Sequence, residues 1–197
     1  VSVESSYRKI AATGEYFDVP MLHIWNVETA EQIIVLKSPH KNSISLIEFG
    51  DNGRWLATIG NDEFHSLAIW RSHGSHWRDG VLQSVHPTTS AGIDWLRWMN
   101  DYHCSLAHGG ADHILFWTIS PTAGIMTQVM PTFGIKGKRQ HIYCAAPFSL
   151  SIKEGSGMSP LTTDNALVTG TESGHLYIWH KSEIHASVRG HHAPVCV

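Results

Sequence analysis

Histidine is the residue type with the greatest capacity for chemistry in this sequence, because imidazole serves both as a metal ligand and as a general acid or base. The chain has 15 of them in 197 residues. His73 and His76 lie three positions apart, and His191 and His192 are adjacent. No cysteine or carboxylate completes a common zinc ligand set with them, and the sequence has no His-Glu-x-x-His motif. We therefore expect no metal site and no cofactor.

Motifs for nucleophilic catalysis and phosphate binding are also incomplete. Ala107-His-Gly-Gly110 resembles an oxyanion loop, but the chain has no Gly-x-Ser-x-Gly nucleophile motif. The segment 134–138 does not form a phosphate-binding loop, because Thr132 occupies the position of the first required glycine. We expect no catalytic residues and hence a protein that is not an enzyme.

The charge distribution argues against a polyanionic partner for the chain as a whole. Its net charge is −3, and no long run of lysine and arginine is present, so we expect neither nucleic acid nor an anionic membrane surface to be bound by electrostatics alone. The one basic cluster is Lys136-Gly-Lys138-Arg139, with His141 nearby. Its simplest interpretation is a solvated loop, and the alternative is a local contact for an acidic partner.

The elements that carry these residues follow an internal repeat. Residues 165–180 read as a short strand, a turn with Gly170 and Gly174, and an alternating strand that ends at Trp179. Three similar phrases end at Trp25, Trp70 and Trp117. The first two intervals between these tryptophans are close to the period of about 40 to 45 residues of a four-stranded propeller blade. The third is longer, and we assign the polar stretch 149–164 as an insertion.

This repeat predicts an all-β fold, a β-propeller with four four-stranded blades and the start of a fifth. We place the blades at residues 1–38, 39–86, 87–134 and 135–190, with the next blade beginning at 191–197. An open arc would leave strand edges unpaired, so we expect these blades to belong to a larger ring. The chain also begins without methionine and ends in a strand-like run, which favours a piece of a longer protein.

Two residues are expected to have structural roles within the blades. Asp112 lies in a tight turn between two predicted strands, where an aspartate commonly accepts hydrogen bonds from backbone amides. His191 follows Gly190 close to the junction of two blades.

The closing tryptophans and the Gly190-His191 pair make the chain resemble WD40-repeat proteins, although the usual Trp-Asp ending is absent. More specifically, His113-Ile-Leu-Phe-Trp-Thr118 and Thr132-Phe-Gly-Ile-Lys136 are similar to phrases of the echinoderm microtubule-associated protein-like (EMAP-like) family. In WD40 proteins the histidine of the Gly-His pair is usually structural. The resemblance implies that the chain is part of the first of two fused propellers. It also implies a cytoplasmic, cytoskeletal location and protein partners such as tubulin, microtubules or microtubule-associated factors.

The first hypothesis is thus a non-catalytic scaffold whose blade loops dock cytoskeletal proteins. A WD40 scaffold subunit of an unrelated assembly, such as a ubiquitin ligase or an RNA-processing complex, is the alternative. An enzyme with catalytic groups in the central channel of a propeller is a third. Hairpin loops are the preferred contact regions because they tolerate variation and lie on rigid strands. The predicted partner-binding residues are Glu15, Tyr16, Phe17, Asp18, Asn61, Asp62, Glu63, Phe64 and His65.

Overall fold

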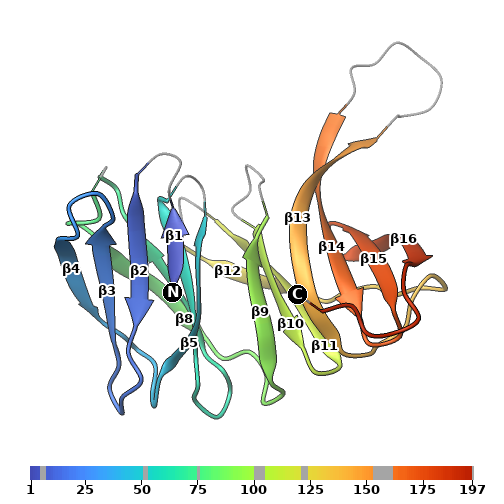
Figure 1. Cartoon of the computed structure of the whole chain (residues 1–197), viewed down its shortest axis with the longest axis horizontal. Coiled ribbons are helices and arrows are strands. Elements are labelled where there is room, and N and C mark those ends of the chain that lie inside the picture. The colour runs from blue at the N-terminus through green and yellow to red at the C-terminus, as the bar shows by residue number, and fades with distance from the viewer. Residues whose placement is uncertain are drawn as a thin grey trace. The chain divides into compact units, whose positions relative to one another are not determined.

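The computed structural model describes residues 1–4, 8–50, 53–74, 76–99, 105–120, 124–152 and 162–196, with the backbone alone at 150–152 and 162–165. These residues form 16 β-strands in four four-stranded antiparallel sheets (Figure 1). Each sheet joins its strands in chain order, and we call the sheets blades 1 to 4. No helix occurs in the described ranges. The predicted all-β class is therefore confirmed.

The chain divides into two compact units, which we describe separately. The first holds blades 1 and 2 and the second holds blades 3 and 4. Blade 1 consists of β1 (Ser2–Glu4), β2 (Ile10–Gly14), β3 (Met21–Asn26) and β4 (Gln32–Lys37), and blade 2 of β5 (Ile44–Gly50), β6 (Trp55–Gly60), β7 (Leu67–Arg71) and β8 (Val81–His86).

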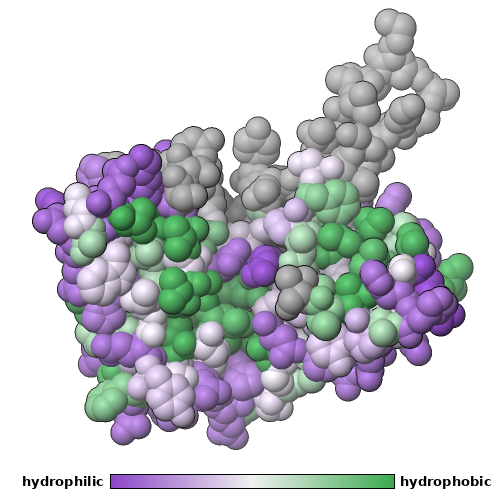
Figure 2. All heavy atoms as spheres, in the orientation of Figure 1, coloured by the Kyte–Doolittle hydropathy of each residue, from purple (hydrophilic) through white to green (hydrophobic). Residues whose placement is uncertain are grey.

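The core of the first unit lies between β1, β2 and β5, where blade 1 meets blade 2. Alternating apolar side chains of β2 and β3 face it, as the period of two in a strand requires. Gly14 permits the close approach, because a Cβ there would lie 2.6 Å from the Cβ of Ile44. Figure 2 shows hydrophobic residues over the first strands of this unit, and Val1 and Val3, at the start of the chain and in the edge strand β1, are exposed.

Trp77 is a core residue of this unit, although it lies in the loop between β7 and β8, which is rich in polar residues and glycine. Its side chain is fully buried, and its indole Nε1 donates a hydrogen bond to the carbonyl of Gly53 over 2.6 Å. It also packs edge-on against Phe49. The backbone of Trp77 has a φ of 55°, so a left-handed turn inside the loop directs the ring inward.

Blades 3 and 4 continue the same pattern in the second unit. Blade 3 consists of β9 (Ile93–Trp98), β10 (Ser105–Gly110), β11 (His113–Ile119) and β12 (Met126–Val129), and blade 4 of β13 (Ile142–Ile152), β14 (Thr162–Thr171), β15 (His175–His180) and β16 (Glu183–Arg189). Trp95, Leu96 and Trp98 are buried, and the indole of Trp95 donates to the carbonyl of Ile142 across the two blades. Trp95 thus fills part of the contact between blades 3 and 4.

One prediction about blade 4 needs correction. The stretch 149–164 is not wholly an insertion, because β13 runs to Ile152 and β14 begins at Thr162 in continuous register; only 153–161 lies outside the described residues. In the segment 191–197, where we place the start of a fifth blade, the described residues 191–196 form no strand. Instead the amide of Val195 donates to the carbonyl of Thr171 over 3.1 Å, so this segment lies along the end of β14.

Candidate protein-binding edge of blades 1 and 2

The two predicted contact loops lie on one edge of the first unit. Both join the second and third strands of their blades, β2 to β3 and β6 to β7, and the segment 41–43 connects them. Tyr16 forms a backbone bridge with Ser43, and the amide of Asn61 donates to the carbonyl of Ser43 over 2.9 Å. The amide of Asn42 also faces the carbonyl of Asp18 at 3.4 Å. We call residues 15–19, 41–43 and 61–65 the contact edge.

Large hydrophobic side chains on the contact edge are open to solvent. The exposed fraction is 87% for Tyr16, 67% for Phe17 and 53% for Phe64, and Val19 is exposed as well. Asp18, Asn61 and Glu63 are also exposed. Aromatic side chains projecting from ordered loops are typical of binding surfaces, because each buries a large apolar area in a partner.

Glu15 is placed differently from its neighbours in the first loop. Its carboxylate accepts a hydrogen bond from the amide of Met21 over 2.9 Å and lies 3.0 Å from Nε2 of His23. The backbone bond from Met21, followed by the His23 contact, lowers the pKa of Glu15 below its usual value. Glu15 therefore braces the base of the loop, and the tip residues Tyr16 and Phe17 project from it.

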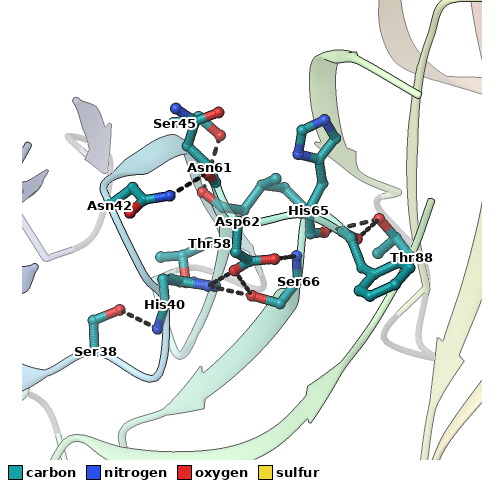
Figure 3. A network of polar contacts seen from close by, with 12 residues as sticks. Ser38, His40, Asn42, Ser45, Thr58, Asn61, Asp62, His65, Ser66 and Thr88 are labelled. Carbon is teal, nitrogen blue, oxygen red and sulfur yellow. Dashed lines mark hydrogen bonds and ion pairs between the residues drawn. The ribbon is translucent and has the colours of Figure 1, made fainter. Parts of the chain in front are cut away.

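Asp62 also braces its loop. Its carboxylate accepts hydrogen bonds from the amide of Ser66 (2.8 Å) and from the hydroxyl of Ser66 (2.5 Å) (Figure 3). Burial raises the pKa of Asp62, but the bonds from Ser66 and the nearby His40 outweigh this and lower it. The predicted contact residue Asp62 thus turns inward, and Glu63 and Phe64 form the exposed tip.

A chain of hydrogen bonds continues from Asp62 into the core of blade 2. Nδ1 of His40 lies 2.7 Å from the Ser66 hydroxyl, and Nε2 lies 2.7 Å from the hydroxyl of Thr58. The indole of Trp70 donates to the same Thr58 oxygen over 3.0 Å. One neutral tautomer of His40, with the proton on Nδ1, satisfies every donor from Trp70 through to Asp62. We call these five residues the blade 2 network.

Burial keeps the imidazole of the blade 2 network neutral. His40 is 2% exposed, and this desolvation lowers its pKa to about 4, against the smaller opposite effect of Asp62. The network contains serine, histidine and aspartate, but Ser66 and Asp62 both face Nδ1, whereas a catalytic triad needs them on opposite ring nitrogens. The arrangement supports the loop and lacks the geometry of a catalytic triad.

The β6–β7 loop is also held from its outer side. The amide of Thr88 donates to the carbonyl of Phe64 (3.0 Å), and its hydroxyl donates to the carbonyl of His65 (2.8 Å). His65 has a φ of 43°, and its ring points away from the blade 2 network (Figure 3). Sequence reasoning missed both His40 and Thr88. The sequence signal for His40 was its position just before the first strand of blade 2.

Parts of this network recur in the other blades. The indole of Trp25 donates to Thr13 in blade 1, and that of Trp179 donates to Thr169 in blade 4, each over 2.9 Å. In blade 3 the position equivalent to these threonines holds His108. Its ring stacks on Trp117, with the ring centroids 6.2 Å apart. The repeated tryptophan and threonine therefore mark one structural site in three blades.

The two predicted turn residues lie in the second unit. Asp112 has a φ of 58° in the turn between β10 and β11, and its side chain is exposed. No hydrogen bond of its carboxylate appears among the contacts of the described residues, so its visible contribution is the left-handed backbone. His191 donates its backbone amide to the carbonyl of Gly174 over 3.0 Å, and its side chain is exposed.

No group of three metal-ligating side chains is found among the described residues. Cys144 is half-buried and Cys196 is exposed, and Cys104 lies outside the described residues. Among the residues that the structure describes, no helix is long and apolar enough to cross a membrane.

Four antiparallel four-stranded blades with closing tryptophans define the class of this protein as a WD40 β-propeller fold. Solved structures support the class. Sqt1 of Saccharomyces cerevisiae is 17% identical, with a TM-score of 0.66 over 95% of this chain and 48% of that chain. The WD40 repeats of RRP9 are 16% identical, with a TM-score of 0.59 over 95% of this chain and 48% of that one.

A further solved neighbour shows a propeller with a bound protein segment. Sqt1 of Chaetomium thermophilum, bound to the N-terminus of the ribosomal protein L10, is 16% identical, with a TM-score of 0.61 over 91% of this chain and 44% of that one. At these identities the likeness establishes the fold alone. The chain spans about half the length of these solved proteins.

Among curated proteins, the chain is similar to cilia- and flagella-associated protein 251 of Chlamydomonas reinhardtii. The two are 22% identical over 200 residues, which cover 94% of this chain and 23% of that protein. No family profile matches the chain.

Proposed function

We propose that this chain is a non-catalytic protein-interaction scaffold and that its contact edge binds a protein partner. The observation that carries this proposal is the exposure of Tyr16, Phe17 and Phe64 on two loops that are joined through Ser43 and braced from below. A rigid edge loses little conformational entropy when a partner docks, so its exposed aromatic area is available for binding energy.

The chemistry of the contact edge favours a partner with apolar and basic side chains. Asp18 and Glu63 flank the aromatic residues and are exposed, and the three segments of the edge contain two basic residues, Lys41 and His65. Charged residues at the rim of an interface steer the partner and select against the wrong sign of charge. The Chaetomium Sqt1 structure, with its bound segment of L10, gives a precedent for a peptide ligand on this fold.

We further propose that the partner belongs to the microtubule cytoskeleton and that the protein acts in the cytoplasm. The similarity to a cilia- and flagella-associated protein supports this, because cilia are built on microtubules. The phrases 113–118 and 132–136 that resemble the EMAP-like family point the same way. The acidic edge fits a basic microtubule-associated factor better than the acidic tails of tubulin.

A scaffold role in a ribosomal-protein or RNA-processing complex is the second candidate. The observation that favours it is the solved neighbour bound to a ribosomal protein. Both candidates use the same fold and the same contact edge, and they differ in the partner.

Co-pelleting with taxol-stabilised microtubules, with and without a microtubule-associated protein fraction, tests the proposal. The variant Tyr16→Ser/Phe17→Ser/Phe64→Ser removes the exposed aromatic groups. The matched control is Val27→Ser, because Val27 is 44% exposed and lies in the β3–β4 turn at the opposite edge of blade 1. We expect the protein and the control to pellet when the fraction is present and the triple variant to stay in the supernatant.

Equal pelleting of the triple variant and the control would contradict a role for the contact edge. If no variant pellets under either condition, the microtubule assignment fails. Binding of the protein and the control to ribosomal proteins, with loss of this binding in the triple variant, would then favour the second candidate.

A further inference from the structure

We infer that the outer corner of blade 4 is a basic groove that receives an acidic peptide segment. An open depression there is lined by Lys136, His175, His185, Ala186, Ser187 and Arg189. These residues come from β15, β16 and the segment that precedes blade 4. The groove belongs to the second unit, so the inference does not depend on the contact edge or on its proposed function.

The strand register explains why the polar groups converge. Side chains two positions apart share one face of a regular strand, so Ser187 and Arg189 project from the same face of β16. His185 lies at a β-bulge of this strand and also lines the depression. Arg189 pairs directly with His175 of β15, and Ser187 pairs with Tyr177. Residues opposite each other in antiparallel strands also share a face, so His175 joins this row.

The segment before blade 4 forms the second wall of the groove. It crosses the same face of the sheet, where Tyr177 is buried and its hydroxyl accepts hydrogen bonds from the side chain of Gln140 (2.5 Å) and the amide of Lys138 (3.2 Å). Gly137 packs closely on the sheet, because a Cβ there would lie 2.3 Å from Cδ1 of Ile184 and 3.2 Å from the ring of Tyr177. The wall is therefore built against the sheet.

Lys136 is held at the mouth of the groove by this wall. Its Nζ donates a hydrogen bond to the carbonyl of His185 over 2.8 Å, which fixes the ammonium beside β16. The ammonium still has two further N–H donors for a ligand. Of the basic cluster seen in the sequence, only Lys136 lines the groove; Arg139 lines a separate small depression with Asp112 and His113.

The charge of the groove is opposite to that of the whole chain. Its described lining has a lysine, an arginine and two histidines but no carboxylate, whereas the net charge of the chain is −3. The positive charges of Lys136 and Arg189, with no carboxylate in the described lining, raise the local concentration of anionic ligands, and the two imidazoles offer further hydrogen-bonding groups. This geometry favours the acidic-partner alternative for Lys136.

A peptide fits the groove better than a nucleic acid does. β16 is the last strand of its sheet, and an extended peptide lies naturally beside an edge strand. Single-stranded nucleic acids use aromatic side chains as stacking platforms. The described lining offers no phenyl, phenol or indole ring, because Tyr177 is buried beneath the wall.

Fluorescence anisotropy with a labelled oligoglutamate peptide tests the groove, with an oligoglutamine peptide of equal length as the neutral probe. The variant Lys136→Glu/Arg189→Glu reverses two charges of the groove. The control variant Lys37→Glu/Arg54→Glu makes the same change in net charge at exposed positions of the first unit. Circular dichroism verifies that both variants are folded.

We expect oligoglutamate to bind the protein and the control, with affinity that falls as salt is raised. The groove variant should lose about tenfold in affinity or more, because two favourable charge pairs become repulsive. Equal loss in both variants, or equal binding of oligoglutamine, would overturn the inference. If oligouridine binds more tightly than oligoglutamate and the groove variant loses this binding, the ligand of the groove is RNA and not a peptide. Each outcome is independent of the variants at Tyr16, Phe17 and Phe64.

Discussion

The β2–β3 loop of blade 1 and the β6–β7 loop of blade 2 lie on the same edge, yet different forces hold them. The first is braced at the surface by Glu15, which bonds Met21 and His23. The second is supported from the core by the blade 2 network, which runs from Trp70 to Asp62 through His40. Both nevertheless present aromatic side chains to solvent.

This difference shows that similar acidic loops need different physical support. A carboxylate at an exposed position shares its hydrogen bonds with water, so its contribution to stability is small. A buried chain of donors and acceptors leaves a costly unsatisfied group when any member is lost. We therefore expect substitutions in the core of blade 2 to destabilise the β6–β7 loop strongly. Substitutions at the surface brace of the β2–β3 loop in blade 1 should change stability only weakly.

The largest expected effect comes from Trp70→Ala. Trp70 is fully buried and donates to Thr58, so its removal leaves a cavity and takes away one of the two hydrogen-bond partners of the Thr58 hydroxyl. Truncation of a buried tryptophan costs about 3 to 5 kcal/mol in the free energy of unfolding. The equivalent Trp25→Ala should cost less, because Trp25 is only half-buried. Urea unfolding followed by tryptophan fluorescence measures both, and equal losses would contradict the comparison.

The pH dependence of stability is the next largest effect. Burial lowers the pKa of His40 from 6.5 to about 4, so the unfolded chain takes up its proton first as the pH falls. The stability that depends on neutral His40 is therefore complete above pH ~6.5 and is lost between pH ~6.5 and ~4, by about 3 kcal/mol. Below pH ~4, protonation of Asp62 removes more, because its own pKa is lowered.

The variant His40→Gln isolates this effect from the other histidines. Its amide can replace part of the hydrogen bonding but does not titrate. We expect the free energy of unfolding of His40→Gln to change less between pH ~7 and ~4 than that of the unmodified protein. Parallel pH profiles for the two proteins would show that His40 does not control acid stability.

A smaller effect is expected from neutralising the two bracing carboxylates. Asp62→Asn weakens the charged hydrogen bonds to Ser66 and should cost about 1 kcal/mol. Glu15→Gln should leave the unfolding midpoint unchanged, because the carboxylate of Glu15 is open to water. Hydrogen exchange of the Ser66 and Met21 amides reports each loop directly. Faster exchange at Met21 in Glu15→Gln than at Ser66 in Asp62→Asn would reverse the comparison.

Much of the fold could be predicted from the sequence, since strand periodicity and the tryptophan repeat are local signals. The network behind Asp62 could not be, because His40, Thr58 and Trp70 are brought together by the pairing of separate strands. Trp77 was missed for another reason: a single left-handed residue turns its ring into the core from a polar loop. Burial of this kind leaves no periodic pattern.

The positions of the contact loops could be predicted from the sequence, but the orientation of their carboxylates could not. Loop position and composition identified residues 15–18 and 61–65. Which carboxylates face outward depends on hydrogen bonds to Met21 and Ser66, and these form only when the hairpins close. The basic cluster was also found from the sequence, but the surroundings of its residues were not. Lys136 lines the groove, whereas Arg139, on the other side of the closely packed Gly137, lines a separate depression.

Site-specific photo-crosslinking tests the central claim most directly, since that claim is that two loops form one binding edge. A photoreactive phenylalanine analogue is placed at Phe17, at Phe64 or at the control position Val27, and crosslinked partners are identified from cells that express the protein. The account predicts that the same protein is captured from Phe17 and Phe64 and not from Val27. Capture of different proteins at Phe17 and Phe64, or of the same proteins at all three positions, would contradict it.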